Sequence, residues 1–515
     1  MKKLFMTLLA VASVGFAGIA NAQETAAPAE LGCVEATVAS VENGVITWNV
    51  GEAQTSLRNG VTTPALSMLE GINEVEVSFK LFAKDKYNSF IEFAAHNAGV
   101  VKGMWVNGVR NTLYKETYPY LNSMVEQVRM IVNNEIIRYS MVKFEDKSTW
   151  NEVRMVVSGV TPQTSLAWLS NPETDKTKFG FCIDDVKVKV ISTVTRENTL
   201  RIMTYNVQNG IWGDEQNNYD NFVKWMQQQD PDICIFCESQ TIYKTGTHDK
   251  CDVTERYLPY KKGVEWERGV DPNLDPAGWI ELGTRWGHTY GKIGAHIDNH
   301  PVTVTSKYPV TLVQKLGAEN PDEIWHGGIH AQVTVNGETI NIVGYHTWPF
   351  GMSRETRGKG KALEQKSQWA NGGDDYRTFE TEYFINSTVK NPKYADQKLW
   401  IITGDTNCRS SLDDNFLGHG PESPRYGSNN YVLKHSGCKD ITKTYYSPDK
   451  RDVMMSTTQH QARIDIMYGS DEMMSRVIRA EIPKDEFTTA PYNKQMRFYD
   501  KSSDHLPVIV DFKWK

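Results

Sequence analysis

The sequence predicts two domains, an N-terminal all-β sandwich followed by an α+β four-layered sandwich of two packed β-sheets flanked by helices. Three observations support this prediction. The chain has 515 residues, which is too long for a single hydrophobic core. Short runs that alternate between polar and apolar residues fill the region from 31 to 190. Beyond residue 200, apolar strand-like runs are interspersed with segments of helical spacing.

The first residues indicate export. A basic start is followed by an apolar run from Leu4 to Ile19 and by a small-x-small cleavage pattern that ends at Ala22. Together these features predict a secretory signal peptide over residues 1–22, followed by a small-residue lead-in at 23–30. Because the apolar run is short for a bilayer, we expect an exported protein, periplasmic or secreted, without an integral membrane segment.

The alternating runs in residues 31–190, such as Glu74–Phe82, predict half-buried strands and no long helix. The last run, Phe179–Val190, resembles the closing strand of jelly-roll domains of the carbohydrate-binding type. That resemblance implies a jelly-roll-like accessory domain with a glycan contact. Three tryptophans are considered for a sugar-stacking platform, but such residues more often belong to the core: Trp105, Trp150 and Trp168.

The chain has seven cysteines, and the sequence does not determine their pairing. Cys33 and Cys182 lie near the two ends of the first domain and are candidates for a disulfide, which export permits. Cys234 and Cys237 form a C-x-x-C motif, but they lie inside an apolar strand-like run, and no second pair stands at zinc-site spacing. We therefore interpret Cys234 and Cys237 as structural rather than redox or metal-binding residues.

A polar, threonine-rich stretch at 191–199 is the predicted linker to a second domain that covers 200–515. In this domain, polar residues of few types punctuate the apolar strands, following a strand, preceding one or, for Asp465, interrupting one: Asn206, Glu238, His346, Asp405, Asn407, Asp465, Asp504 and His505. A single polar residue at a strand end is often only a cap or a turn former. A set with the residue types of one chemistry instead indicates an open active site at the edge of a sheet.

These residue types suit the attack of water on a phosphoester. Such a reaction needs a hard cation to neutralise the phosphate and the leaving oxygen, and carboxylate oxygens are the ligands that Mg2+ prefers. Histidine titrates in the range that a proton acceptor for the water requires. Asparagine amides and imidazoles can donate to the non-bridging oxygens. We therefore expect Mg2+ as the cofactor, with Mn2+ or Ca2+ as alternatives.

On these residues, the second domain resembles the endonuclease/exonuclease/phosphatase superfamily, the fold of deoxyribonuclease- and sphingomyelinase-like proteins. The matching pieces occur in the family's order across 200–515: Tyr205–Gln208, the strand that ends at Glu238, Thr305–Val310, Gly344–His346, Gly404–Asn407, Arg463–Asp465 and Ser503–Pro507. Any one of these pieces is a weak signal, whereas the ordered set is specific.

The resemblance implies a metal site. It implies Glu238 as the main Mg2+ ligand, with Asn206 beside it and Asp504 as an additional ligand. One departure concerns Gln208, which stands where some members of the family carry a second acidic metal ligand. This departure favours a single dominant metal site at Glu238.

The resemblance also implies catalytic roles. It implies His505 as the general base or as a phosphate-binding group, held in its tautomer by Asp465. Asp405 is implied as the acid that positions or activates water or that protonates the leaving group. Asn407 and His346 are implied as donors to phosphate oxygens. The sequence leaves open how base and acid are divided between His505 and Asp405.

Further substrate contacts are predicted at five positions: His296, His326, His330, Arg285 and Trp348. His326 and His330 have the i, i+4 spacing that zinc sites often use, but two adjacent glycines between them argue against a helix. In nuclease members, the histidine that corresponds to His346 pairs with a carboxylate. That residue should lie between Cys251 and His300, where the acids are too many to choose from.

The sequence therefore predicts an exported Mg2+-dependent phosphoester hydrolase, with a phosphodiesterase as the first choice. The alternatives are an extracellular nuclease, a sphingomyelinase-type phospholipase or phosphomonoesterase, and a non-catalytic glycan-binding protein. The formal net charge of −7 argues against a protein that coats nucleic acid by bulk charge. The natural substrate and the oligomeric state do not follow from the sequence.

Overall fold

The computed structural model divides into two compact units, the first from Met1–Asn198 and Tyr445–Asp452, the second from Thr199–Thr444 and Val453–Lys515. It describes residues 38–42, 45–48, 60–62, 65–83, 90–96, 99–111, 139–143, 149–169, 181–211, 214, 219–239, 277–295, 300–321, 323–349, 373–446, 456–459, 462–483, 485–489 and 501–515. The predicted signal peptide, the lead-in, Cys33 and His296 lie outside the described residues.

Between residues 38 and 194, the regular elements of the described residues are all strands. One sheet has the order β1 (Val38–Glu42), β2 (Val45–Trp48), β11 (Phe181–Val194), β4 (Ile72–Ala83), β9 (Asn151–Val160), β6 (Val100–Val106), β7 (Val109–Arg110). A second has the order β3 (Gly60–Thr62), β10 (Ser165–Leu169), β5 (Phe90–His96), β8 (Tyr139–Lys143). Side chains of both sheets form one core, which includes Val77, Phe93 and Met155. The sheet-rich architecture predicted for this part of the chain is confirmed.

The three tryptophans considered for a sugar-stacking platform do not form a common surface. Trp168 is 1% exposed and packs edge-to-face on Phe93 in the core, because it lies on the inward side of β10. Trp168 is therefore a core residue, the more common of the two places considered for it, and cannot belong to a platform. Trp150 is exposed, whereas the Trp105 ring is covered by the guanidinium of Arg154, 3.8 Å from the ring centroid.

The stretch predicted as a linker is largely regular structure. β11 continues to Val194, which pairs with Ile72 at the start of β4. A short 3-10 turn, η2 (Arg196–Asn198), then leads directly into the first strand of the second unit. The strand residues of this stretch, 191–194, are exposed or half-buried, which explains why its composition resembled a linker.

The second unit contains two six-stranded sheets. The β12 sheet has the order β14 (Tyr290–Ile293), β15 (Thr303–Ser306), β13 (Ile233–Cys237), β12 (Thr199–Asn206), β23 (Val508–Lys513), β22 (Val477–Glu481). The β19 sheet has the order β16 (Val310–Leu316), β17 (Gly327–Val335), β18 (Glu338–His346), β19 (Trp400–Asp405), β21 (Asp465–Gly469), β20 (Lys439–Asp440). The two sheets approach closely, since a Cβ added at Gly344 would lie 2.8 Å from the Ile235 side chain.

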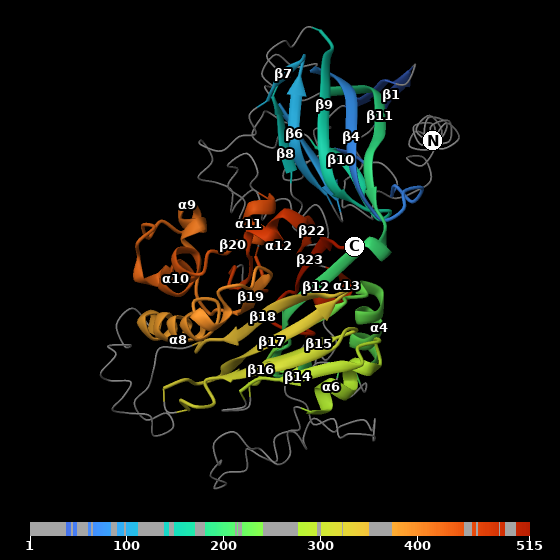
Figure 1. Ribbon diagram of the computed structural model, residues 1–515. Helices are drawn as coiled ribbons and strands as arrows, with labels where there is room; N and C mark the ends of the chain where they lie inside the picture. The colour runs from blue at the N-terminus through green and yellow to red at the C-terminus, as the bar shows by residue number, and fades with distance from the viewer. Residues whose placement is uncertain are drawn as a thin grey trace. The chain divides into compact units, whose positions relative to one another are not determined.

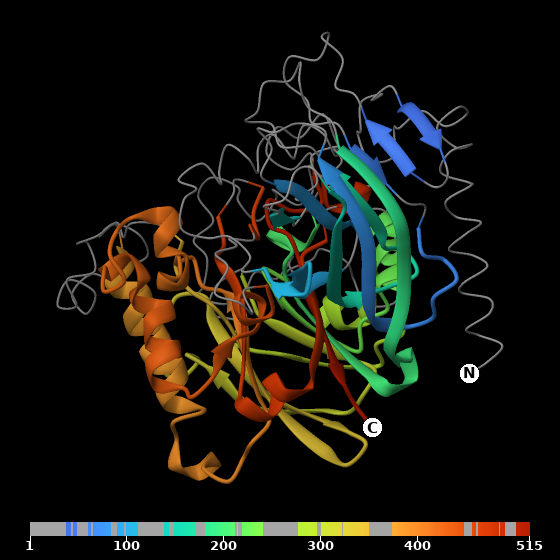
Figure 2. The ribbon, with the colours of Figure 1, turned by 90° about the horizontal axis from the view of Figure 1, so that it is seen from above.

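Helices cover the outer faces of the two sheets (Figure 1, Figure 2). α4 (Asp220–Gln229), α6 (Ala277–Thr284) and α13 (Glu486–Thr489) contribute to the core on the β12 sheet, whereas α8 (Asp374–Ser387) and α10 (Gly427–His435) pack on the β19 sheet. The shorter helices are α3 (Gln208–Ile211), η6 (Pro392–Tyr394), η7 (Ser411–Asp413), α9 (Asp414–Leu417), η8 (Pro424–Tyr426), α11 (Ile441–Tyr446) and α12 (Asp471–Arg476). Two packed sheets flanked by helices, as predicted, make up the described residues of this unit.

The helix predicted between the first two strands of this unit is present as α4. The residues at helical spacing are all buried: Tyr219, Phe222, Val223 and Met226. The helix stops at Asp230, which adopts the left-handed conformation with φ 47°, directly before Pro231. This end is the one expected from a proline that cannot continue the helical hydrogen bonding.

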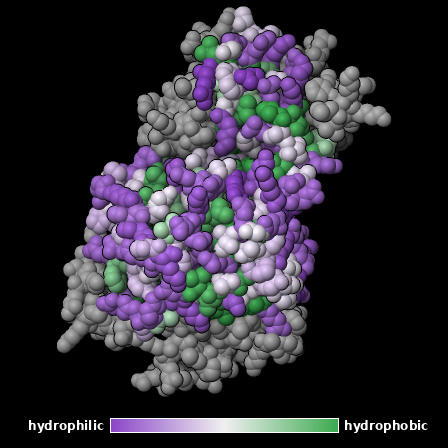
Figure 3. Space-filling model, in the orientation of Figure 1, coloured by the Kyte–Doolittle hydropathy of each residue, from purple (hydrophilic) through white to green (hydrophobic). Residues whose placement is uncertain are grey.

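Among the described residues, no helix combines the length and the apolar composition needed to cross a membrane. Figure 3 shows a mostly hydrophilic face in which apolar residues form small, separate patches. In the part of the chain that the structure describes, the large exposed apolar side chains are far apart in the sequence, namely Met68, Val109, Trp150, Ile191, Tyr290 and Leu412. Isolated exposed side chains of this kind are normal for a folded protein surface.

A buried histidine between α6 and β15 predicts pH-dependent stability. The His288 ring contacts Thr305 Oγ1 and the Pro231 carbonyl, both at 2.8 Å, and burial lowers its pKa to about 4. In the unfolded chain the pKa of histidine is about 6.5, so the unfolded state binds the proton first as the pH falls. The stability that neutral His288 contributes above this pH is therefore lost as the pH falls towards 4.

Because of this residue, we expect the free energy of unfolding to fall by about 2 kcal/mol between pH 7 and pH 5. A pH of 5 lies about 1.5 units below the pKa of histidine in the unfolded chain, and each unit is worth about 1.36 kcal/mol. His288→Gln keeps a hydrogen-bonding side chain but does not titrate, so its stability should depend less on pH by that amount. Urea unfolding of both proteins at the two pH values measures the difference. Equal pH dependence in the two proteins would contradict the assignment.

Candidate active site

The polar residues predicted from the strand ends meet at one edge of the two sheets. β12 and β13 are parallel, so Asn206 and Glu238 leave the β12 sheet at the same edge. β18 and β19 are also parallel, and their register pairs His346 with Asp405. β21 runs in the opposite direction and begins at this edge with Asp465, which pairs with Asp405.

The chain turns sharply where these strands end. Glu238 has φ 55° and Asn407 has φ 43°, so both adopt the left-handed conformation that side chains other than glycine rarely take. Gly404 has φ 144°, and a Cβ there would lie 1.9 Å from the Tyr345 carbonyl oxygen. The glycine before Asp405 is thus required by the close approach of β18, and the strained turns hold the polar side chains at the edge.

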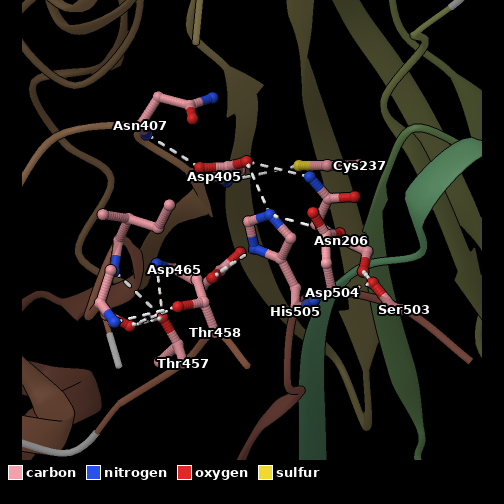
Figure 4. A network of polar contacts seen from close by, with 12 residues as sticks. Asn206, Cys237, Asp405, Asn407, Thr457, Thr458, Asp465, Ser503, Asp504 and His505 are labelled. Carbon is pink, nitrogen blue, oxygen red and sulfur yellow. Dashed lines mark hydrogen bonds and ion pairs between the residues drawn. The ribbon is translucent and has the colours of Figure 1, made fainter. Parts of the chain in front are cut away.

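An asparagine amide lies between two carboxylates at the centre of this edge. Asn206 Nδ2 donates to Glu238 Oε1 at 3.2 Å. It also donates to Asp405 Oδ2 at 2.9 Å (Figure 4). The other Glu238 oxygen, Oε2, accepts from the Asn209 backbone N–H at 2.9 Å. The two carboxylates come from different sheets, so this amide joins the two halves of the site.

A histidine–carboxylate pair lies beside this centre. His505 Nδ1 is 2.8 Å from Asp465 Oδ2, and the Asp465 backbone N–H donates to Thr457 Oγ1 at 3.0 Å (Figure 4). The His505 backbone N–H donates to Ser503 Oγ at 3.0 Å. His505 Nε2 lies 3.6 Å from Asp405 Oδ2. One ring nitrogen is therefore held by Asp465 while the other faces the carboxylate at the centre of the site.

Neighbouring imidazoles keep the central carboxylates ionised. Burial alone would raise the pKa of Glu238, but the nearby histidines, among them His300, hold it below its usual value. For Asp405, burial is likewise outweighed by His505 and His346, and its pKa lies well below the ordinary range. The site therefore holds negative charge that is available to a cation or a proton.

The charge on His505 is set by the acids around it. Burial would lower its pKa, but Asp465, Asp405 and Asp504 together raise the pKa of His505 well above its ordinary value. Its Nε2 atom is 3.9 Å from Asp504 Oδ1 and 3.6 Å from Asp405 Oδ2. An imidazolium surrounded by carboxylates is the charge state that this geometry favours.

The two residues predicted as phosphate-oxygen donors lie next to Asp405. His346 Nε2 is 3.4 Å from Asp405 Oδ2. The Asn407 backbone N–H donates to Asp405 Oδ1 at 2.8 Å, and its side-chain Nδ2 donates to the Thr347 carbonyl at 2.9 Å. Residues 251–276, where most of the candidates for the carboxylate partner of His346 lie, are outside the described residues.

The other predicted substrate contacts lie in several different places. His326 is buried and stacks on the His346 ring at 4.2 Å between centroids, and Trp348 lies against its ring at 5.2 Å. His330 faces away from this edge, in the core under α8, with its ring stacked on Trp400. The prediction that His330 lines the substrate cleft is wrong, because its position on β17 directs its side chain to the face of the β19 sheet that α8 covers. Arg285 pairs with an acid of α4 at 2.6 Å.

Several residues at the site carried no signal that sequence reasoning could use. Thr457 Oγ1 accepts the backbone N–H groups of Ile464 and Asp465, both at 3.0 Å, but threonines in loops are common. His300 lies near Glu238 and is followed by a proline, a pattern with no specific meaning.

A second set of ligand atoms at this edge could also hold a metal ion. One ligand atom each from Asp405, Asp465 and His505 lies within 4.8 Å of the others, and all three side chains are buried. The Nδ1–Oδ2 hydrogen bond already joins Asp465 to His505. That bond occupies His505 Nδ1 and one oxygen of Asp465, so we describe this trio as a histidine–carboxylate pair next to an acid.

Comparisons with known proteins give the following matches. No family model and no curated protein matches the chain. Solved structures similar to it include an AP endonuclease from Archaeoglobus fulgidus, with 15% identity, 61% of this chain and 99% of that chain covered, and a TM-score of 0.36. A 3'-5' exonuclease from Neisseria meningitidis has 16% identity, coverage of 61% and 100%, and a TM-score of 0.37. Sphingomyelinase C from Streptomyces griseocarneus has 16% identity, coverage of 61% and 99%, and a TM-score of 0.35. These structures have the endonuclease/exonuclease/phosphatase fold.

Proposed function

We propose that this protein is an exported phosphoester hydrolase that uses a divalent metal ion, Mg2+ in the first place, and that cleaves a phosphodiester with water. One observation supports this most. The Asn206 amide links the Glu238 and Asp405 carboxylates, and the His505–Asp465 pair faces Asp405 from 3.6 Å. A cation site, a proton acceptor and a charged imidazole at one edge are the groups that this hydrolysis needs.

The donor set at Glu238 fits a hard divalent cation. Glu238 is ionised and partly exposed, and the carboxamide of Asn206 adjoins it. Burial and the negative charges of Glu238 and Asp405 raise the pKa of Asp504, a repulsion that a cation would offset. Glu238, Asn206 and Asp504 would hold the ion. When bound, it would neutralise charge on the phosphate and on the leaving oxygen.

We propose a division of the proton chemistry between Asp405 and His505. Three donors converge on Asp405 Oδ2, from Asn206 at 2.9 Å, His346 at 3.4 Å and His505 at 3.6 Å. An oxygen in this position stays ionised, so we assign Asp405 to position the attacking water and to accept its proton. His505 is held by Asp465 and presents Nε2 to the same space, where it donates to a phosphate oxygen.

His346 and Asn407 supply further donors for the phosphate. Asn407 Nδ2 already donates to the Thr347 carbonyl at 2.9 Å, but an amide nitrogen carries two hydrogens, so the second remains available to a phosphate oxygen. His346 approaches Asp405 from the β18 side of the site. These neutral or cationic donors surround the place where charge develops in the transition state.

A substrate panel tests this function. We expect the full-length mature protein to hydrolyse bis(p-nitrophenyl) phosphate, or one natural phosphodiester among DNA, RNA and sphingomyelin, only when Mg2+ is present. Chelation with EDTA should abolish the activity, and excess Mg2+ should restore it, because the ion neutralises the phosphate. The same panel with p-nitrophenyl phosphate distinguishes a phosphomonoesterase. Activity that is insensitive to EDTA, or no hydrolysis of any of these substrates, would contradict the proposal.

A further inference from the structure

The two sheets of the second unit are joined by a thiol directly beneath the candidate site. Cys237, the last residue of β13, belongs to the β12 sheet, and its Sγ accepts a hydrogen bond from the Asp405 backbone N–H at 3.4 Å (Figure 4). The same thiol donates to the Tyr345 carbonyl of β18 at 3.6 Å. Both partners belong to the β19 sheet, so one side chain bonds to the two strands that carry His346 and Asp405.

The thiol lies between the backbone segments that carry the two carboxylates of the site. Cys237 immediately precedes Glu238, and its acceptor contact is to the backbone of Asp405 itself. Glu238 adopts φ 55°, so its backbone is strained and needs neighbouring contacts to hold it in place. A shift of β13 relative to β19 would therefore change the distance between the Glu238 and Asp405 carboxylates.

The environment of Cys237 favours packing and hydrogen bonding over thiol chemistry. Its side chain is fully buried, and burial raises the pKa of the thiol well above its ordinary value. A thiol in this state is neither a nucleophile nor an efficient metal ligand. What remains is its shape and its ability both to donate and to accept a hydrogen bond at sulfur distances, a combination that alanine and valine lack and that the smaller oxygen of serine supplies only in part.

We infer that Cys237 is a positioning residue that sets the spacing between the Glu238 and Asp405 carboxylates by joining the two sheets. The expected effect of Cys237 on kcat rests on the proposed function. Its expected effect on the affinity of the site for a divalent cation does not depend on which substrate the protein cleaves.

The chain offers a matched control in Cys234. It lies on the same strand and is also fully buried, but its side chain faces the opposite side of the sheet, in the core with Phe222 and Trp279. We would compare Ala, Val and Ser replacements at Cys237 with the same replacements at Cys234. The thermal unfolding temperature, the Mg2+ affinity by calorimetry without substrate, and kcat and KM for bis(p-nitrophenyl) phosphate would be measured for each.

We expect both positions to lose similar thermal stability on replacement by alanine or valine. Only C237A and C237V should also weaken Mg2+ binding and lower kcat, each on the order of 10- to 100-fold, because a misplacement of about 1 Å is enough for such losses. C237S should recover part of both, since serine can still donate and accept. These three results together would support the positioning role.

Several outcomes would overturn the inference, and they can be told apart from failure of the proposed function. If C237A and C237V bind Mg2+ like wild type and lose no more activity than C234A and C234V, the thiol is only core packing. If wild type binds Mg2+ but hydrolyses no phosphoester, the proposed function fails, while the Mg2+ affinities of the variants still decide the role of Cys237. If wild type binds no divalent cation, both ideas fail.

Discussion

Replacing His505 by alanine is expected to lower kcat/KM for the phosphodiester substrate by ~10²–10³-fold, the usual loss when one hydrogen-bond donor to the charge-bearing oxygen of the transition state is removed. The imidazole is held by Asp465 at 2.8 Å on one nitrogen and faces Asp405 at 3.6 Å on the other. Alanine removes the imidazole that lies between these two carboxylates. Steady-state kinetics at saturating Mg2+ measure the effect, and thermal unfolding checks that the variant is folded.

Two variants sharpen this test. Asp465→Asn keeps the size of the side chain but removes the charge that orients His505, so a smaller loss than that of H505A is expected. His435→Ala, at the exposed end of α10, removes a histidine from the surface and should retain wild-type activity. Full activity in H505A would remove His505 from the reaction and with it the assignment of the site.

The position of the site could be predicted from the sequence because the relevant signal is local. Each apolar run fixes the end of a strand, and the residue that follows it leaves the sheet at that edge. Parallel neighbours such as β12 and β13 must then place Asn206 and Glu238 side by side. The match of Gly404 and Asp405 to a strand end is equally local, whereas the reason for the glycine, the close approach of β18, is visible only in the structure.

The side of a strand on which a residue lies could not be predicted as easily. His326 and His330 are four residues apart, yet only His326 lies beside His346 at the edge of the site. Their segment begins β17, and on that strand Ile329 lies against Gly344 at the interface between the sheets, so His330 must face the helical side. Which face of β17 lies against the other sheet and which lies against the helices depends on how the whole unit packs. A short sequence motif carries no information about this packing.

Contacts between the sheets could not be predicted at all. Cys237 and Asp405 are far apart in the sequence, and their contact depends on the distance at which the two sheets pack. The same holds for Thr457, which supports Asp465 through its hydroxyl. Such residues have no characteristic neighbours in the sequence, because cysteine in an apolar strand and threonine in a loop are both ordinary.

Replacing Glu238 is expected to remove the response to metal. Glu238→Ala should lower Mg2+-dependent kcat/KM on the order of 10³-fold, because a catalytic cation is worth several kcal/mol of transition-state stabilisation. Glu238→Gln keeps the acceptor for the Asn209 backbone N–H but loses the charge, so its activity should require more Mg2+ rather than vanish. Activity as a function of Mg2+ concentration measures both effects.

A readout without substrate separates this prediction from a loss of catalysis alone. An ion that binds only the folded state stabilises it, so Mg2+ should raise the thermal unfolding temperature of wild type and of H505A but not of E238A. Glu338→Gln, which breaks a partly exposed ion pair with Arg476 at the start of β18, is the matched control and should respond to Mg2+ like wild type. If E238A is stabilised by Mg2+ to the same extent as wild type, the ion binds elsewhere, and the Asp405, Asp465 and His505 trio becomes the alternative ligand set.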